Sequence, residues 1–346
     1  RIRACHVRGS FVARDNVKPR ISTRELQMEP APFDYARLAH PPVTFQHEKL
    51  KYEVRMPAAR KYIVDAGLNE LFDGDRTELG IIVQGGLYNN LVRALQALGL
   101  ADAYGRSRIP ILNLNVVYPL VPEQITAFCA GKRAVLVAEE GQPDFIEQEI
   151  NTILRRADLQ TKLHGKDLLA MGGEYTAELL LAGLVRYLAA HAPDLPRGAA
   201  EGLLADIAGL KAQAPGAFSG PVPARPPNFC TGCPERPVFA ALKLVEQDIG
   251  KLHVSADIGC HSFATFAPFS FGNSILGYGM SLASSAGVRN FSARRPVAVM
   301  GDGGFWHNGL LSGVSSALLN KGDGVLIIMK NGYTSATGTQ ETISTP

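Results

Sequence analysis

The segment PVAVMGDGGFWHNGLLSGVSSALLNKGDGVLIIMKN, residues 296 to 331, constrains the fold more than any other part of the chain. An apolar run, Val297 to Met300, ends at Gly-Asp-Gly-Gly, and a helix is expected at roughly Trp306 to Asn320. A second apolar run, Val325 to Met329, ends at Asn331. A strand, a crossover helix and a strand form a parallel pair with a right-handed connection, so both strands end at one edge of the sheet. Ligands of open α/β sheets bind at that edge.

Two polar residues at this edge predict a site for a hard cation and a phosphate. Asp302 and Asn331 project oxygen atoms from neighbouring strand ends, as Mg²⁺ requires, and that ion usually binds phosphates with its other positions. Gly301, Gly303 and Gly304 let backbone N–H groups approach a phosphate closely. The alternative is an ordinary turn followed by a loop asparagine. Spacing, strand placement and glycines together favour the cofactor site.

The cysteines indicate a second possible site, one that binds a metal or carries out redox chemistry. Five cysteines in 346 residues do not make a disulfide framework, so the close pair Cys230 and Cys233 is interpreted as metal-binding or redox-active. Cys260 follows a short strand, HVSADIG, and is expected at the same sheet edge as Asp302. Three hypotheses stay open: zinc on the three cysteines with His261, a dithiol pair, or an iron–sulfur cluster that needs a fourth cysteine. The helix expected after Cys233 would favour a thiolate or an anionic cluster at its N-terminus.

The remaining sequence predicts an α/β protein with two parallel-sheet domains. Residues 1–76, rich in Pro, Arg and His with one helix near AARKYIVDAGLNELF, predict a connector. Residues 77–191 alternate runs such as LGIIVQGG with amphipathic ones such as LYNNLVRALQALG, which is typical of a parallel α/β domain. Residues 192–227 are rich in Ala, Gly and Pro and predict a linker with one short helix. Residues 228–346 return to α/β.

Charge and hydropathy exclude several classes of partner. The 35 Lys and Arg against 32 Asp and Glu leave a net charge of +3, too small and dispersed to favour nucleic acid or a membrane surface. The apolar runs are shorter than the ~20 residues that span a bilayer, and no leader precedes them, so a cytoplasmic protein is expected. The chain opens RIRACHVRGS without a methionine and stops soon after a dense run of motifs, so a fragment of a longer protein is expected.

The motifs together resemble a known family. Gly301-Asp302-Gly303, then 27 residues, then Asn331, resembles the diphosphate-binding signature of thiamine-diphosphate enzymes. With FCTGCPERP, ADIGCHSF and NGYTSATGTQ, it resembles the catalytic portion of 2-oxoacid:ferredoxin oxidoreductases, and most of all the indolepyruvate branch in its large fused form. GIIVQGGLYNN and VLVAEEGQPDFIEQEI resemble that family's middle domain, which is related to the transketolase C-terminal domain. RIRACHVRGSFV resembles the tail of its pyrimidine-binding domain.

The resemblance implies a reaction and its partners. A 2-oxoacid, by default an arylpyruvate such as indolepyruvate, would be oxidatively decarboxylated to an acyl-CoA, and electrons would pass through a [4Fe-4S] cluster to ferredoxin. Thiamine diphosphate and Mg²⁺ would be the further cofactors, and coenzyme A a co-substrate. The pyrimidine-binding and gamma-like domains or subunits would be partners in an enzyme that forms homo-oligomers. The glutamate that activates the aminopyrimidine is not identifiable here.

The resemblance also implies residue roles. His261 would contact the substrate or the aminopyrimidine, with a loop histidine bonded to backbone as the alternative. A fourth cluster cysteine would lie beyond the end of this chain. The implied Mg²⁺ ligands are Asp302, Asn331 and the carbonyl of Tyr333; the cofactor contacts are Gly301, Gly303, Gly304 and Thr337; and the cluster ligands are Cys230, Cys233 and Cys260.

Two other functions fit parts of the pattern. A non-redox thiamine-diphosphate lyase or synthase would explain Gly-Asp-Gly and Asn331 but leave the three cysteines without a role. A zinc-stabilised subunit without catalysis would explain the cysteines and serve as a scaffold in a larger complex. Iron and labile sulfide analysis separates these alternatives.

Overall fold

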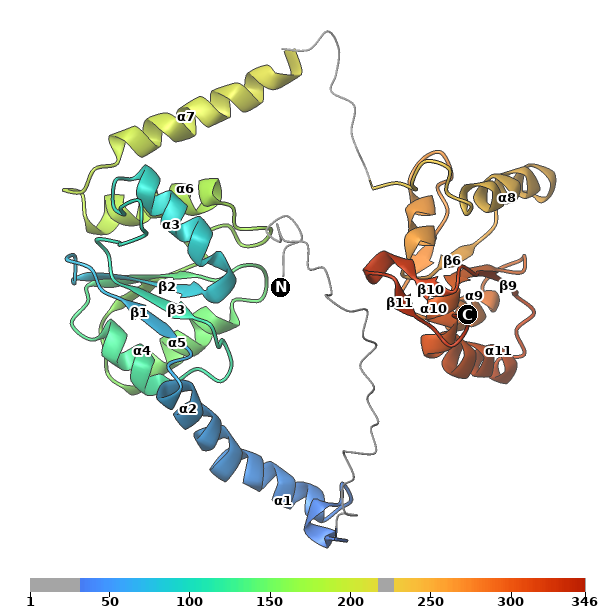
Figure 1. The fold of residues 1–346 in the computed structure, drawn as a ribbon, viewed down its shortest axis with the longest axis horizontal. Helices are drawn as coiled ribbons and strands as arrows, with labels where there is room; N and C mark the ends of the chain where they lie inside the picture. Colours follow the sequence, from blue (N-terminus) through green and yellow to red (C-terminus); the bar gives the residue numbers. More distant parts are fainter. Residues whose placement is uncertain (1–31, 217–226, 346) are drawn as a thin grey trace. The chain divides into compact units, whose positions relative to one another are not determined.

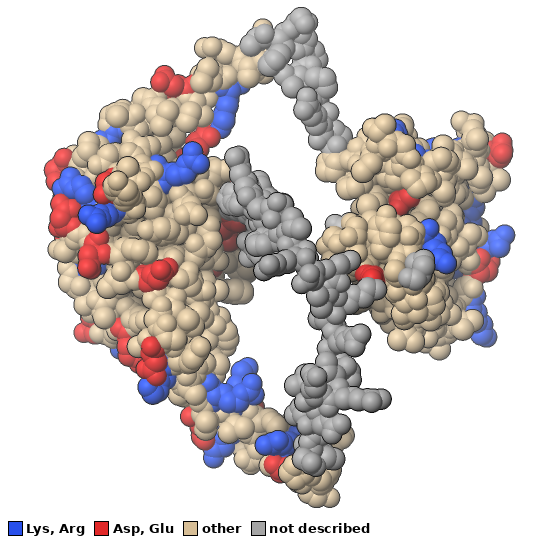
Figure 2. Space-filling model, in the orientation of Figure 1, with Lys and Arg blue, Asp and Glu red and all other residues tan. Residues whose placement is uncertain are grey.

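The computed structural model describes residues 32–216 and 227–345, and the chain divides into two compact units, Arg1–Gly220 and Pro221–Pro346 (Figure 1). The segment RIRACHVRGSFV lies outside the described residues, and the expected boundaries at 76, 191 and 227 stay predictions. Basic and acidic side chains are interspersed on the face that Figure 2 shows. No helix in the described ranges is both long and apolar enough to cross a membrane.

The first unit contains a mixed five-stranded sheet in the order β1-β3-β2-β4-β5. All neighbouring strands are parallel except β1, which pairs antiparallel with β3 at one edge. The central strands are buried on both faces, which explains their continuous apolar sequence. The strands are β1 (Glu70–Phe72), β2 (Leu79–Gln84), β3 (Ile111–Leu114), β4 (Ala134–Ala138) and β5 (Lys162–His164).

Helices cover both faces of this sheet (Figure 1). Alternate residues of β2 enter different cores: Ile81 packs with α3 and α6, whereas Ile82 packs with α4 and α5. The predicted alternation of strand and helix is therefore confirmed. The helices are α3 (Tyr88–Ala97), α4 (Pro122–Cys129), α5 (Phe145–Arg156) and α6 (Ala177–His191), with the 3-10 turn η4 (Gly85–Leu87) before α3.

The segment before the sheet differs from expectation. The helix expected near AARKYIVDAGLNELF is present but stops at Asp65, because Gly67 adopts φ +58°, the left-handed conformation at which helices end. Residues 70–72 of the same segment form the edge strand β1, which the sequence analysis did not predict. The preceding elements are η2 (Tyr35–Arg37), α1 (Val43–Leu50), the π-helical η3 (Lys51–Arg55) and α2 (Met56–Asp65).

The expected linker contains a longer helix than its composition indicated. α7 (Gly198–Gln213) runs for 16 residues, and η5 (Ala214–Gly216) follows it. Alanine and leucine are strong helix formers, and they outweigh the glycines in this stretch. Only Ala200 of α7 is buried within the described structure, so this helix contributes little to the core.

Tyr187 joins two strands of the first unit through one buried hydroxyl group. It donates to the carbonyl of Ala134 at 2.8 Å and also lies 3.3 Å from that of Gly80, and burial raises the pKa of the phenol. We expect Tyr187→Phe to lower the free energy of unfolding by about 1–2 kcal/mol, because these buried acceptors lose a donor. Tyr104→Phe, at a side chain that is 92% exposed, is the control and should stay within about 0.5 kcal/mol. Equal urea midpoints for the two variants would contradict the assignment.

The second unit contains a parallel four-stranded sheet in the order β7-β6-β8-β9. β8 lies between β6 and β9 and is buried through Met300, and β9 is the more exposed edge strand. The runs HVSADIG, PVAVMG and GVLIIM therefore form neighbouring parallel strands, as predicted. The strands are β6 (Val254–Ala256), β7 (Ser274–Ile275), β8 (Val297–Gly301) and β9 (Val325–Met329).

The helix that connects β8 to β9 begins earlier than expected. It starts at Asp302 rather than near Trp306, and its middle part is π-helical, a distortion that is frequent at functional sites. The helical elements of this unit are α8 (Arg236–Ile249), η6 (Cys260–Thr265), α9 (Ser281–Arg289), α10 (Asp302–Gly304), η7 (Phe305–Val314), α11 (Ser315–Leu319) and η8 (Ser335–Thr337), and a hairpin of β10 (Tyr333–Thr334) and β11 (Gln340–Glu341) follows β9.

Candidate active site

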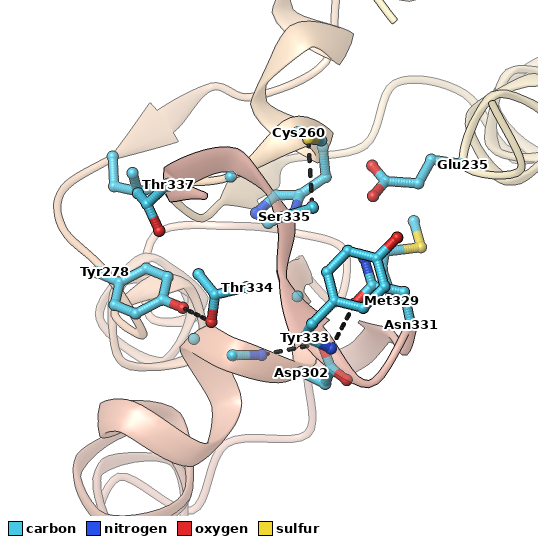
Figure 3. A pocket seen from close by; sticks show the side chains of 16 residues that line it. Glu235, Cys260, Tyr278, Asp302, Met329, Asn331, Tyr333, Thr334, Ser335 and Thr337 are labelled. Carbon is cyan, nitrogen blue, oxygen red and sulfur yellow. Dashed lines mark hydrogen bonds between the residues drawn. The ribbon is translucent and has the colours of Figure 1, made fainter. Parts of the chain in front are cut away.

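A pocket of about 260 Å³ opens at the carboxyl ends of β6, β8 and β9 (Figure 3). Parallel strands end together at this edge, so residues far apart in sequence meet there. The pocket brings together three groups of residues: the Gly259–His261 segment after β6, the Gly301–Gly304 segment after β8, and residues of the β9–β10 region from Met329 to Thr337. Glu235, at the start of α8, Ile258 and Tyr278 also line the pocket.

Asp302 joins the ends of the two central strands. The side chain is 3% exposed, and its Oδ1 accepts a hydrogen bond from the Gly303 N–H at 3.0 Å. Its Oδ2 accepts from the Gly332 N–H at 2.7 Å and from the Ser344 hydroxyl at 3.2 Å. These contacts hold the loop after β9 against the end of β8. An ionised carboxylate offers about four lone-pair positions, so three donors leave it capacity for a cation.

Asn331 shapes the loop that faces Asp302. Its Oδ1 accepts a hydrogen bond from the Tyr333 N–H at 3.1 Å, which is a local turn, and Gly332 between them has φ +81°. The side chain of Asn331 is exposed and lines the pocket. A carboxylate, an amide oxygen and the Tyr333 carbonyl form the all-oxygen donor set that Mg²⁺ prefers, so the chemistry of these residues fits the expected Mg²⁺.

Gly303 lies so close to two neighbouring hydroxyl groups in the pocket that a side chain at this position would collide with them. A Cβ at this position would lie 2.4 Å from the Tyr278 hydroxyl and 2.5 Å from Thr334 Oγ1, which are themselves 3.4 Å apart. Gly303 also stands in the first turn of the helical run that follows β8, where backbone N–H groups and the helix dipole favour an anion. The cradle therefore fits a phosphate group. Thr337 lines the same pocket and is exposed.

His261 is buried beneath the glycines of the strand ends. Its side chain is 3% exposed, and a Cβ on Gly259 would lie 2.5 Å from the His261 Cε1. Burial lowers the pKa of the imidazole, and the carboxylate of Asp257 opposes that shift. The backbone of Asp257 bonds the ring, and Nε2 has no hydrogen-bond partner within the described residues. His261 therefore lies in the pocket wall with one buried ring nitrogen that has no partner among the described residues.

The structure does not gather the three cysteines into one ligand group. Cys260 lines the pocket with its Sγ 3.5 Å from Ser335 Oγ, whereas Cys230 is exposed and Cys233 packs against the core of the unit. A tight turn at Gly232, with φ +74°, links the pair through a Cys233 N–H to Cys230 carbonyl bond of 3.2 Å. Across residues 32–216 and 227–345, no three His, Cys, Asp or Glu side chains lie close enough to hold a metal. The residues as arranged here fit neither zinc nor a cluster.

Several pocket residues escaped sequence reasoning. Glu235 stands within CPERP but received no role; burial raises the pKa of its carboxyl, and its Oε2 has no hydrogen-bond partner in the described structure. Met329 and Ser335 also line the pocket. The one signal for Glu235 was an acidic residue two positions after a Cys-x-x-Cys motif. Its direction into the pocket depends on how α8 packs.

Comparisons with known proteins agree with this arrangement. Residues 257–346 match the family model described as "Thiamine pyrophosphate enzyme, C-terminal TPP binding domain". Residues 69–179 match the "Indolepyruvate ferredoxin oxidoreductase middle domain". The first unit therefore matches the middle-domain model, and the second unit matches the thiamine pyrophosphate-binding model.

Curated relatives match across both units. Indolepyruvate oxidoreductase subunit IorA of Methanothermobacter thermautotrophicus is 29% identical over 313 residues, 89% of this chain and 46% of that protein. The subunit of the same name from Archaeoglobus fulgidus is 28% identical over 286 residues, 83% of this chain and 42% of that protein. The chain thus spans about half the length of the curated relatives it matches. A solved 2-oxoglutarate:ferredoxin oxidoreductase from Magnetococcus marinus matches with TM-score 0.31 and 16% identity, over 43% of this chain and 24% of that one.

The second sheet with its glycine cradle and oxygen donors, together with the matched model, defines a thiamine-diphosphate-binding α/β domain. Across both units the chain is similar to indolepyruvate oxidoreductase subunits, which places the resemblance on the indolepyruvate branch of the 2-oxoacid:ferredoxin oxidoreductases. The family resemblance and the two α/β domains expected from the sequence are therefore confirmed.

Proposed function

We propose that this chain takes part in the thiamine-diphosphate-dependent oxidative decarboxylation of a 2-oxoacid to an acyl-CoA, with ferredoxin as electron acceptor. An arylpyruvate such as indolepyruvate is the proposed substrate, because the relatives are named indolepyruvate oxidoreductase subunits. The observation that carries the proposal is the Asp302 carboxylate, which ties the ends of β8 and β9 together beside the Gly303 cradle.

The oxygen donors would bind the metal ion, and the glycines would bind the diphosphate of the cofactor. Asp302 and Asn331, with the Tyr333 carbonyl, would hold Mg²⁺ at the pocket floor, and the ion would neutralise the diphosphate charge. The diphosphate would contact the backbone at Gly301, Gly303 and Gly304 and the hydroxyl of Thr337. These contacts would orient the bound group, because they would fix its charged end where β8 and β9 end.

The other pocket walls would position the substrate. When bound, thiamine diphosphate supplies the carbanion chemistry that a 2-oxoacid needs to lose CO₂. Ile258 and Met329 line the pocket with apolar side chains that would contact the organic part of a ligand. His261 would accept a hydrogen bond at Nε2, since its other ring nitrogen already bonds the backbone of Asp257.

The proposed [4Fe-4S] cluster rests on sequence rather than on side-chain geometry. Cys230, Cys233 and Cys260 have the spacing that the family resemblance implies, but they do not converge here, and we derive no step through a cluster. Ferredoxin, coenzyme A and the pyrimidine-binding and gamma-like domains are proposed partners. A cytoplasmic homo-oligomer is the proposed state of the enzyme.

Iron and labile sulfide in the anaerobically purified native enzyme test the redox part of this proposal. We expect iron and sulfide in about a 1:1 ratio, and loss of the visible absorbance in Cys260→Ala, because a thiolate ligand is removed. Cys129→Ala is the matched control: that thiol is buried in the core of the first unit, and burial raises its pKa to about 12, so it is inert. Unchanged absorbance in Cys260→Ala would contradict the cluster assignment.

The separation of the cysteines favours a second candidate function. A non-redox thiamine-diphosphate lyase or synthase would use the same floor and need no cysteine ligands. Purified enzyme without iron or sulfide, but with bound thiamine diphosphate, would support that function. About one zinc per chain without sulfide would instead support the zinc-stabilised subunit.

A further inference from the structure

Glu235 lines the pocket, and its carboxyl group makes no hydrogen bond that would stabilise the fold of the described residues. It directly precedes α8, yet its side chain makes no capping hydrogen bond to that helix. Its Oε2 is inaccessible to solvent and has no hydrogen-bond partner among residues 32–216 and 227–345. Buried polar atoms in native proteins are nearly always paired, so an unpaired carboxyl oxygen requires an explanation.

Glu246, within α8, is a useful comparison because its carboxylate is paired with neighbouring groups. Glu246 is also largely buried, but its carboxylate accepts from the Leu252 N–H at 3.0 Å and pairs with Lys243 at 3.0 Å. It joins the helix to the strand that follows. Glu235 has no such contact in the described structure, and it lies at the pocket rather than between elements.

The direction of Glu235 places its carboxyl where a ligand would lie. Figure 3 shows the side chain extending into the pocket from α8, on the side of Cys260 and Met329 and away from Asp302. Asp302 and Asn331 occupy the floor, so Glu235 faces the organic part of a bound molecule rather than its diphosphate. The terminal torsion of a glutamate is broad and roughly two-fold, so rotation of the carboxyl group about this bond can present either oxygen to the pocket.

We propose that Glu235 is a ligand-binding residue whose carboxyl accepts a hydrogen bond from an N–H or O–H group of the molecule that fills this pocket. The donor belongs to the organic part of the cofactor or to the 2-oxoacid. The inference depends on the proposed function, because it needs thiamine diphosphate on the floor. Glu235 would thus recognise the ligand. Its unpaired acceptor would destabilise the free protein, as features kept for function often do.

Two properties of Glu235→Leu test the proposal with the 346-residue chain. The free protein should melt about 2 °C higher or more, because a buried acceptor without a partner is removed. Its affinity for the ligand should fall about 10-fold or more, because the hydrogen bond is lost. Glu235→Gln keeps a carbonyl acceptor and should bind within about threefold of the wild type. Fluorescence of Trp306, the single tryptophan, which follows the Gly301–Gly304 segment, reports binding.

Three titrations locate the donor. Inorganic diphosphate with Mg²⁺ contacts only the floor and should bind Glu235→Leu and wild type equally. A loss with thiamine diphosphate places the donor on the cofactor, and a loss only when indolepyruvate is added to the saturated protein places it on the substrate. Equal affinities of Glu235→Leu and wild type for both organic ligands would overturn the proposal.

A matched control and the wild type separate the remaining outcomes. Glu246→Gln should lower the melting temperature and leave all three affinities unchanged, because Glu246 is paired and does not line the pocket. Wild type that binds neither diphosphate nor thiamine diphosphate would overturn the proposed function and this inference with it. Wild type that binds both, beside an unaffected Glu235→Leu, would overturn this inference alone.

Discussion

Asp302→Asn should lower the affinity of the chain for thiamine diphosphate with Mg²⁺ by about 100-fold or more. The substitution keeps the shape of the side chain but removes the negative charge that would hold the cation. It also replaces one acceptor oxygen with an amide donor facing the N–H of Gly303 or Gly332, so the loop after β9 would lose its link to β8. A loss of about 100-fold equals roughly 2.8 kcal/mol, within the range for hydrogen bonds and ion contacts of a buried charged group. Titration monitored by Trp306 fluorescence measures it.

The chain contains a matched control for this experiment. Gly322-Asp323-Gly324 repeats the same triplet in the same unit, but Asp323 precedes β9 instead of following a strand. Its side chain is exposed and pairs with Arg289, which lowers the pKa of the carboxyl through a hydrogen bond. Asp323→Asn should therefore leave the affinity unchanged. Equal losses in both variants would show that a general charge effect, rather than a metal ligand, explains the result.

The two Gly-Asp-Gly triplets also show how much of the site was predictable. Asp302 and Asn331 meet because both follow apolar runs that form neighbouring parallel strands, and that topology is readable from the order of strand, helix and strand. Asp323 has the same local sequence but stands at the opposite end of a strand. Position relative to the strand, rather than the triplet, carries the prediction.

Side-chain direction was the part that sequence could not supply. Cys230 and Cys233 were expected to converge with Cys260, but the turn at Gly232 leaves Cys230 exposed and places Cys233 against the core. The positions of these cysteines depend on how α8 packs. One contact that fixes this packing is that of Phe239 with Phe269, whose ring centroids are 5.8 Å apart. Such contacts join residues 30 positions apart, and no local pattern encodes them. The same packing turns Glu235 into the pocket.

The edge strand β1 illustrates a second limit. Glu70–Phe72 is a three-residue strand at the end of a segment for which the sequence predicted only a helix nearby. Pairing with β3 through Asn113 and Leu112 forms this strand. Tertiary pairing decides a short, half-exposed segment, whereas the buried central strands were predictable from their own composition.

Gly303→Ala should lower affinity for thiamine diphosphate by more than 10-fold and destabilise the second unit by about 1–3 kcal/mol. The new methyl group would lie 2.4 Å from the Tyr278 hydroxyl and 2.5 Å from Thr334 Oγ1, so one of those side chains must move into the pocket or away from its partner. Cofactor titration and thermal unfolding of the same variant measure the two effects. Gly287→Ala, on an open face of α9 with nothing within 4 Å, should instead raise stability by about 0.5–1 kcal/mol.

A rescue experiment distinguishes this close approach from a general intolerance of substitution. Adding Tyr278→Phe and Thr334→Ala to Gly303→Ala removes both oxygen atoms that the methyl group would meet. Most of the stability should return, because the clash is gone, and affinity should recover in part because the cradle regains its width. Recovery of stability without any recovery of affinity would show that the Tyr278 and Thr334 hydroxyls themselves bind the diphosphate. Recovery of neither would contradict the close approach to the Tyr278 and Thr334 oxygen atoms as the cause of the loss.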